Sequence, residues 1–400
     1  MSADEAHVER FRVVIAGGGV AALEAALALH DLAGDLVSVT IVAPNPEFVY
    51  RPLLVREPFT PAVTTNYSLP EIARRAGAEL LVDSFKWLDP RGRAVHTDHG
   101  KKLEYDAVLL AMGARTHPRF RNVLTLDDKR IREQLADFVA AIDGGRLKSV
   151  AFVVPSLPIW SLPAYELALM TANRSRARGH DISVLLVTPE DSPLAALGVN
   201  ASAEVAGLLA ESGITTITSA TCQIRERGRI DVYPLRSSIL VDQIISMPEL
   251  YAPSLPGVPT SAERGFVTID SHGAVHGLSR VYAAGDITDT PVKHGGLSAD
   301  QADVAAQSIA ALAGAPLEPR PLRPSLHVVL LGADQPLFIR SQMLGEHGID
   351  LELSSDPLWQ PTQKLHTEYL GPVLADMDAA RVEPPREQEP GARAEPPGER

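Results

Sequence analysis

Residues 11–29 read Phe-Arg-Val-Val-Ile-Ala-Gly-Gly-Gly-Val-Ala-Ala-Leu-Glu-Ala-Ala-Leu-Ala-Leu, and this stretch decides the fold of the chain. The apolar run from Phe11 to Ala16 predicts a strand, and the alanines and leucines from Ala21 to Leu32 predict a helix. Between them stands a G-x-G-x-x-A pattern, which in a strand–turn–helix context is typical of a dinucleotide-binding turn.

The small residues of this turn each have a physical reason. Gly17 permits a tight turn, Gly19 lets the backbone approach a pyrophosphate, and Ala22 keeps helix and strand close. Ala21 begins the helix, whose N-terminus then faces the phosphates, and Val20, just before it, is also expected at the cofactor. A first turn of a doubly wound sheet can also carry glycines without holding a dinucleotide, so this motif alone leaves that alternative open.

A second signature, Tyr-Ala-Ala-Gly-Asp at 282–286, lies about two-thirds of the way along the chain. The strand predicted from Val281 to Ala284 ends in Gly285 and Asp286, which places a carboxylate where a ribityl hydroxyl can donate to it. The alternative for Asp286 is a helix N-cap or a turn residue. Because both signatures in this order rarely arise by chance, together they predict bound FAD.

The adenosine half of FAD has weaker support. An Asp or Glu roughly 20 residues beyond the glycines normally holds the adenosine ribose. Here the strand predicted from Val37 to Val42 ends in Ala-Pro-Asn, so Asn45 or Glu47 would have to substitute by hydrogen bonding.

Composition sets the broad class. The chain has 400 residues, 45% hydrophobic and 22% charged, which indicates a soluble globular protein of two to three domains. No apolar stretch approaches the ~18 residues of a membrane span. The acidic start lacks the features of a secretory signal, so we expect a cytoplasmic protein. A net charge of −13 argues against nucleic acid as a partner.

Cys222 is the only cysteine of the chain, which excludes an intramolecular disulfide and a zinc cluster built on several thiolates. We predict no metal site. A buried apolar role for Cys222 is favoured over a reactive thiol.

The order of predicted elements indicates an α/β fold with two Rossmann-like dinucleotide-binding domains. The FAD-binding domain is discontinuous, over 8–116 and 250–316, and an NAD(P)-binding-like domain at 117–249 is inserted into it. A proline-rich connector leads into a small C-terminal module at 317–378. Its one expected strand is 326–331, and a disordered tail is expected at 379–400.

Several stretches together resemble one group of flavoproteins. They are GGGVAALEAA (17–26), PEFVYRPLLV (46–55), AMGAR (111–115), LPAYELA (162–168), VYAAGDIT (281–288) and PVKHGGLSADQA (291–302). Over about residues 11–315 the chain is similar to the pyridine nucleotide-disulfide oxidoreductase-like group that contains sulfide:quinone oxidoreductases and type II NADH dehydrogenases. The resemblance implies two dinucleotide domains, non-covalent FAD and two-electron transfer through N5 of the flavin.

The resemblance also implies roles for individual residues. Glu166 would lie near the flavin and relay a proton, and the alternative is an acid that favours the first helical turn. Lys293 would stabilise negative charge at N1 and the C2 carbonyl, and the alternative is a surface lysine. Arg51 would cover the flavin, or else be a solvated loop cation. Other residues expected near the cofactor are Ala111, Gly113, Gly296 and Leu297.

Two departures separate the chain from these flavoproteins. Sulfide:quinone oxidoreductases depend on a pair of redox cysteines, which Cys222 alone cannot supply. Type II NADH dehydrogenases carry a second glycine-rich turn, but here residues 155–163 contain three prolines and no glycine, and proline donates no N–H. The usual sulfide oxidation and tight NADH binding are both disfavoured.

The leading hypothesis is therefore an FAD-dependent oxidoreductase that takes electrons from a small donor and passes them to a quinone-like or other acceptor. One alternative is a flavin-binding regulatory or interaction protein that has lost catalysis. Another is an NAD(P)H dehydrogenase with an atypical nucleotide site. Peripheral membrane contact stays open, but the segment 364–377 is short and we expect Pro372 to break it. The oligomeric state is not predicted.

Overall fold

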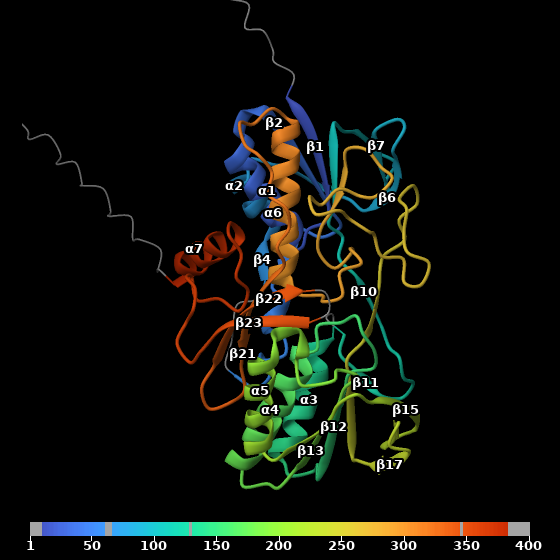
Figure 1. Ribbon diagram of the computed structural model, residues 1–400, viewed down its shortest axis with the longest axis vertical. Helices are drawn as coiled ribbons and strands as arrows, with labels where there is room; N and C mark the ends of the chain where they lie inside the picture. The colour runs from blue at the N-terminus through green and yellow to red at the C-terminus, as the bar shows by residue number, and fades with distance from the viewer. Residues whose placement is uncertain (1–9, 61–65, 128–129, 345–346, 383–400) are drawn as a thin grey trace, which may run out of the picture.

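The computed structural model describes residues 10–60, 66–127, 130–344 and 347–382. Two α/β units follow one another along the long axis of the molecule, and the C-terminal strands lie between them (Figure 1). The predicted fold class is confirmed, because each unit is built on a five-stranded parallel sheet of Rossmann type.

The first sheet draws its strands from two distant parts of the chain. Its order is β20-β9-β1-β2-β5 and every pair is parallel. The strands are β1 (Phe11–Ala16), β2 (Val37–Ala43), β5 (Glu79–Val82), β9 (Ala107–Leu110) and β20 (Val281–Ala283). Because β20 pairs with β9, the segment that carries the second signature closes the sheet that begins with the first.

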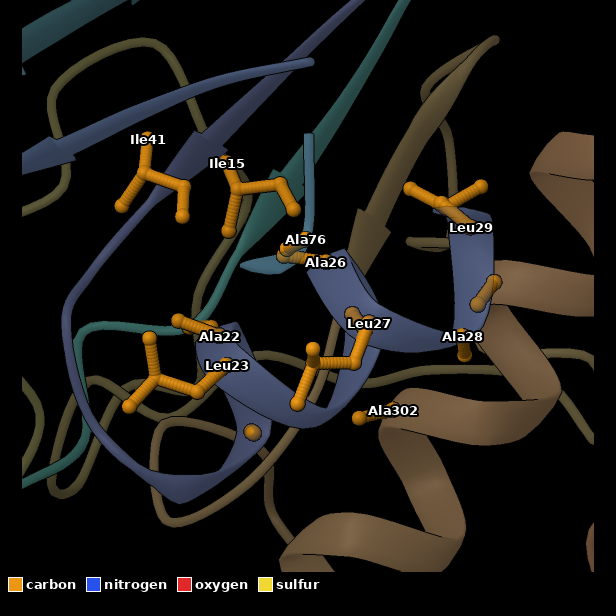
Figure 2. Packing of buried hydrophobic residues seen from close by; sticks show 14 of the residues in the cluster. Ile15, Ala22, Leu23, Ala26, Leu27, Ala28, Leu29, Ile41, Ala76 and Ala302 are labelled. Atoms are coloured by element: carbon orange, nitrogen blue, oxygen red, sulfur yellow. The ribbon is translucent and has the colours of Figure 1, made fainter. Parts of the chain in front are cut away.

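Helices α1 (Val20–Ala33) and α6 (Gly295–Leu312) pack against each other beside this sheet. Alanines on both helices allow their close approach, and Figure 2 shows Ala302 of α6 in the same cluster as Leu27 and Ala28 of α1. Ten of the fourteen residues of α1 are buried, so this is an interior helix and not an amphipathic surface helix.

The second sheet, of order β11-β18-β12-β13-β14, is also entirely parallel. Its strands are β11 (Leu124–Thr125), β12 (Ser149–Val153), β13 (Ser183–Val187), β14 (Ile214–Ile217) and β18 (Gln243–Ser246). One face packs on helices α3 (Ile131–Asp143), α4 (Leu162–Ala177) and α5 (Val199–Glu211). The other face packs on an antiparallel sheet of β15 (Thr221–Glu226), β16 (Arg229–Tyr233) and β17 (Ser237–Leu240).

Short elements complete the two units. Strands β10 (Arg115–His117) and β19 (Glu249–Tyr251) pair antiparallel where the chain crosses between the units. The first unit also holds β3 (Glu47–Val49), β4 (Asn66–Ser68), β6 (Phe85–Asp89), β7 (Ala94–Thr97), β8 (Lys102–Glu104) and helix α2 (Leu69–Arg75). Single 3-10 turns are η1 (Gly34–Leu36), η2 (Arg51–Leu53) and η3 (Ala195–Leu197).

The C-terminal module is an antiparallel sheet followed by a helix. Its strands are β21 (Ser325–Leu330), β22 (Leu337–Leu344) and β23 (His347–Ser354), and its helix is α7 (Leu370–Val382). Pro372 stands in the first turn of α7, where its missing N–H has no intrahelical acceptor to satisfy, so the expectation that it breaks the segment was wrong.

The boundary placed at residues 378 and 379 falls inside α7, and the remainder of the expected disordered tail, 383–400, lies outside the described residues. Within the part of the chain that the structure describes, no helix combines the length and apolarity that crossing a membrane requires.

Candidate active site

The two dinucleotide signatures meet at one place. Strands β1 and β20 both flank β9, so their turns leave the same edge of the sheet. Gly285 has φ +85°, and a Cβ built on it would lie 3.2 Å from Cβ of Ala21 and 3.4 Å from Cβ of Ser298. The glycine therefore fits into the junction between the first turns of α1 and α6. Segments about 265 residues apart thus form a single site.

Gly17 and Gly19 are glycines for different structural reasons. Gly17 has φ +135°, and a Cβ there would lie 2.2 Å from the carbonyl oxygen of Ala111. Its N–H donates to the carbonyl of Val42 at 2.9 Å, so Gly17 is required by the fold. A Cβ on Gly19 would meet nothing within 4 Å, and Gly19 caps α1 without a side-chain hydrogen bond. The open space at the uncapped start of α1 fits the pyrophosphate of a dinucleotide.

The neighbouring residues of the signature serve the packing of this turn. Ala21 and Ala22 are buried, whereas Val20, the first residue of α1, is partly exposed. Ala111 is buried behind Gly17, and Gly113, with φ +66°, faces open space.

Gln301 holds the turn that carries Asp286. The buried Gln301 side chain accepts the N–H of Gly285 at 2.7 Å and donates to Oγ1 of Thr290 at 2.6 Å. This anchor was missed from the sequence, although Gln301 lies inside the stretch PVKHGGLSADQA.

Lys293 is a buried cation, so the alternative of a surface lysine is wrong. Its ammonium donates to the carbonyl of Thr288 and lies 3.8 Å from the ring centroid of Phe266. Burial lowers the pKa of Lys293 to about 8, and the nearby Asp286 and Asp289 act in the opposite direction. Because its charge interacts with that of Asp286, Lys293 belongs to the same site. The role of Lys293 toward the flavin stays a prediction.

The start of α6 is uncapped and carries an unsatisfied imidazole. His294 is the N-cap residue and is buried, and its Nδ1 has no hydrogen-bond partner among the described residues. Its ring lies 4.8 Å from that of Trp160. A Cβ on Gly296 would lie 2.9 Å from Cε1 of His294, so Gly296 makes room for the imidazole, and Leu297 is buried in the core beside it.

The environment of His294 keeps its imidazole neutral, because burial lowers its pKa to about 3. A neutral ring with one free nitrogen, next to helix N–H groups without a side-chain cap, suits a polar and electron-rich group. These residues therefore fit the flavin end of FAD.

Glu166 is tied to the C-terminal module. Its side chain is 1% exposed, one oxygen accepts the N–H of Leu331 at 2.9 Å, and the other pairs with the ammonium of Lys364. Burial raises the pKa of Glu166, while Lys364 counteracts the shift. The carboxylate joins α4 to the module, and a proton-relay role stays a prediction.

The segment Lys364–His366 packs against the start of α6. The N–H of Leu365 donates to the hydroxyl of Tyr50 at 2.9 Å, and a Cβ on Gly295 would lie 2.6 Å from the Leu365 side chain. Arg51, next to Tyr50, is exposed at the beginning of η2. Sequence reasoning considered 364–377 only for membrane contact and missed its packing against α6, because no local motif marks it.

On the adenosine side, Asn45 and Glu47 both lie on the surface after β2. Glu47 accepts a hydrogen bond from the Asn66 side chain at 3.4 Å. Neither residue is thus buried or held by tight internal contacts, and ribose binding by them stays a prediction.

The nucleotide region of the second unit is filled by internal hydrogen bonds. Glu190, which follows β13, is buried and accepts hydrogen bonds from three hydroxyls. The donors are Ser161 at 2.9 Å, Tyr165 at 2.7 Å and Thr188 at 2.8 Å. The carboxylate is therefore satisfied within the protein and is not presented to a ribose.

Cys222 lies on β15, on the side of the second sheet opposite α4. Burial raises the pKa of its thiol to about 12, which suppresses the reactive thiolate. In residues 10–382, leaving out those that the structure does not describe, no group of three or more His, Cys, Asp or Glu side chains is placed to hold a metal.

Comparison with known proteins places this site in a family. The sequence model of the pyridine nucleotide-disulphide oxidoreductases matches residues 11–308. The sulfide-quinone reductase of Aquifex aeolicus (strain VF5) is 23% identical over 272 residues, which cover 63% of this chain. The match spans 60% of that relative, less than two thirds of its length.

Solved structures show the same fold. The sulfide:quinone oxidoreductase of Aquifex aeolicus superposes with a TM-score of 0.75 at 18% identity, over 86% of this chain and 87% of that one. The ferredoxin reductase of the CYP199A2 system of Rhodopseudomonas palustris gives 0.62 at 18% identity, over 83% and 82%. The NAD-dependent persulfide reductase of A. fulgidus gives 0.58 at 16% identity, over 83% and 64%. With the family match covering most of the chain and both FAD signatures in one site, this protein belongs to the pyridine nucleotide-disulphide oxidoreductase family.

Proposed function

We propose that this protein takes electrons from a small donor and passes them through FAD to a quinone-like or other acceptor. The observation that carries the proposal is the contact of Gly285 with Ala21, which joins both signatures into one site between the uncapped starts of α1 and α6. Similarity to sulfide-quinone reductase supports a quinone as acceptor.

The residues that would hold FAD divide by the part of the cofactor they suit. The turn at 17–22 and the start of α1 would hold the pyrophosphate, and Asp286 would accept from the ribityl chain. The N–H groups at the start of α6 and the imidazole of His294 would meet the isoalloxazine, next to the Lys293 charge. When bound, the flavin supplies two-electron redox chemistry.

The donor is neither sulfide attacked by paired cysteines nor NADH bound at the usual turn. The thiol of Cys222 has a raised pKa and lies on an antiparallel sheet of the second unit. At residues 155–163 three prolines replace the N–H donors that phosphates need, and Glu190 is satisfied by internal hydrogen bonds. We infer a small donor that reaches the flavin directly.

An anaerobic reductant screen tests the proposal. The FAD-loaded protein is titrated with thiols, sulfide, NADH and NADPH while the visible flavin absorption is followed, and a quinone is then added. We expect bleaching by one donor class that is not a pyridine nucleotide, followed by quinone-dependent recovery. Recovery at the same rate with and without quinone would contradict the acceptor, and bleaching by NADH at micromolar concentration would contradict our exclusion of that donor.

A second candidate is an FAD-binding regulatory protein without turnover. The observation that favours it is the cover over the start of α6, where Leu365 contacts Gly295 and Glu166 is paired with Lys364. The same screen separates the two, because a regulatory protein would hold flavin that only dithionite bleaches.

A further inference from the structure

A second cavity, distinct from the two dinucleotide turns, lies among residues of α4, the C-terminal strands and α7. Its volume is about 1290 Å³, enough for a drug-sized ligand. Residues from η2 and the turn after it, the C-terminal half of α4, strands β21 and β22, and α7 line it. Neither the FAD turns nor the proline-rich turn contributes to its walls.

Basic side chains outnumber acidic ones on the walls of this cavity, although the chain as a whole is acidic. Its walls carry five cations and two acids, whereas the chain has a net charge of −13. The cations are Arg56, Arg174, Arg178, Lys364 and Arg381, and the acids are Asp334 and Asp378. Four of these cations are paired with carboxylates: Arg174 and Arg178 with Asp143, Lys364 with Glu166, and Arg381 with Asp378.

Arg56 is the wall cation that is available to a ligand. Arg56 is half-buried, and its guanidinium makes no hydrogen bond and no ion pair with any residue that the structure describes, although its charge acts on the nearby carboxylate of Glu166. Arg174, by contrast, is forked onto Asp143 at 2.7 Å by two of its nitrogens and donates a third hydrogen bond to the carbonyl of Phe59. An unpaired guanidinium in a cavity presents the donor fork that matches a carboxylate or a phosphate.

Part of the wall is apolar. Met170, Val329 and Phe338 each expose less than a tenth of their surface and line the cavity together with Leu53 and Phe59. A simple inorganic anion would leave these side chains without a partner, whereas an aliphatic or aromatic body would cover them. The cavity thus combines a free cation with an apolar wall.

We propose that this cavity binds a small amphiphile with one anionic head group, whose head lies on Arg56 and whose apolar body lies on Met170, Val329 and Phe338. The shared chemistry is a carboxylate or phosphate on a hydrocarbon body. The inference concerns binding and stands apart from the proposed redox function, so its test requires no turnover.

Binding is measured by isothermal titration of the full FAD-loaded chain with decanoate, decyl phosphate and the neutral 1-decanol, all below their aggregation limits. We expect saturable binding of both anions at one site, with decanol at least about tenfold weaker, because the head group loses its charge-assisted hydrogen bonds. Arg56→Gln should weaken both anions about tenfold and leave decanol unchanged. Arg56→Lys should retain part of the affinity, because it keeps the charge but loses the fork.

Two further variants locate the site. Ala177→Trp, at the exposed end of α4 on the cavity wall, should weaken all three ligands by filling the space. Arg225→Gln is the matched control, because Arg225 is an exposed arginine on β15 outside the cavity. Thermal melting of every variant confirms that it is folded. Displacement of decanoate by phosphatidylglycerol vesicles assigns the head group to a bilayer lipid, and binding that vesicles do not displace assigns it to a free amphiphile.

Three results overturn the proposal. One is decanol binding as tightly as decanoate, because the head group would then contribute nothing. The second is an unchanged affinity for both anions in folded Arg56→Gln. The third is equal weakening by Arg225→Gln and Arg56→Gln, which would reduce the effect to general charge.

Discussion

The ion pair of Glu166 and Lys364 gives the largest expected effect on stability, because both side chains are almost fully buried. The two side chains are 1% and 7% exposed, and Glu166 also accepts the N–H of Leu331. Glu166→Gln keeps an oxygen for that N–H but leaves the Lys364 ammonium buried beside an amide. A buried charge that loses its partner costs about 3–5 kcal/mol, so we expect the free energy of unfolding to fall by that amount.

The loss of stability caused by Lys364→Met is expected to depend on pH. Without the ammonium, only the Leu331 N–H and the charge of Arg56 oppose the effect of burial on Glu166, so its folded-state pKa rises further above the ordinary value of 4.5. The folded protein then holds a proton that the unfolded chain releases as pH rises past 4.5, so the stability of this variant falls from that pH up to the raised folded-state pKa. The destabilisation should therefore be larger at pH 8 than at pH 5. The double variant, Glu166→Gln with Lys364→Met, should lack this pH dependence.

Urea unfolding of the wild type, both single variants and the double variant completes a double-mutant cycle. We expect a coupling energy of at least about 2 kcal/mol, because the double variant leaves no unpaired charge. A loss below about 1 kcal/mol for Glu166→Gln together with negligible coupling would refute the reasoning, since only a solvated pair behaves so.

Three further predictions follow from the same geometry. Gly17→Ala should lower the free energy of unfolding by at least about 3 kcal/mol by urea titration, whereas Gly19→Ala should keep its melting temperature and lose FAD on gel filtration. Burial and the neighbouring Glu24 raise the pKa of Asp303, so stability falls as pH rises above the unfolded-state value, and Asp303→Asn should stabilise more at pH 8 than at pH 5. Cys222→Ala should change the rate of flavin reduction by less than about twofold, and a larger loss in stopped flow would restore a role for its thiol.

The FAD turn could be predicted because its determinants are local. The helix expected at Ala21–Leu32 lies at Val20–Ala33, and the strand expected at Phe11–Ala16 has those same ends. Buried parallel strands and interior helices are marked by apolar runs and by the residues that end them, all within one stretch of chain. The second signature was equally readable: the strand expected at Val281–Ala284 lies at Val281–Ala283, and Gly285, which packs against Ala21 of α1, follows two residues later.

The C-terminal strands could not be predicted in the same way. Strands β22 and β23 mix exposed leucines with polar residues, and their pairing contains a bulge between Arg340 and Ser341. Antiparallel strands of this kind are stabilised by their partners more than by their own composition. The prediction for Pro372 was wrong because the effect of a proline depends on where the helix begins. A proline inside a helix breaks it, whereas one in the first turn does not.

The C-terminal module covers the start of α6 through contacts between residues far apart in the sequence, which no local pattern can predict. Lys364 meets Glu166 across 198 positions of the chain, and Leu365 meets Tyr50 across 315. Glu24 on α1 accepts the N–H groups of Tyr369 and Leu370 at 2.9 and 2.7 Å, at the start of α7. Glu24, Tyr50 and Glu166 are buried, and their hydrogen bonds to the module form only when the module is docked. The module and the flavin site are therefore built as one unit.

The chain keeps the turn that holds FAD but lacks two features through which electrons usually enter flavoproteins of this group. The dinucleotide turn at 17–22 keeps the features that hold FAD, whereas the turn at 155–163 and the cysteine content do not provide the usual routes for electrons to enter. In the function that we propose, the donor reaches the flavin through the part of the site that the module leaves open. Because Lys364 is both the partner of Glu166 and part of the wall of the basic cavity, a change in the packing of the module acts on the site and on the cavity together.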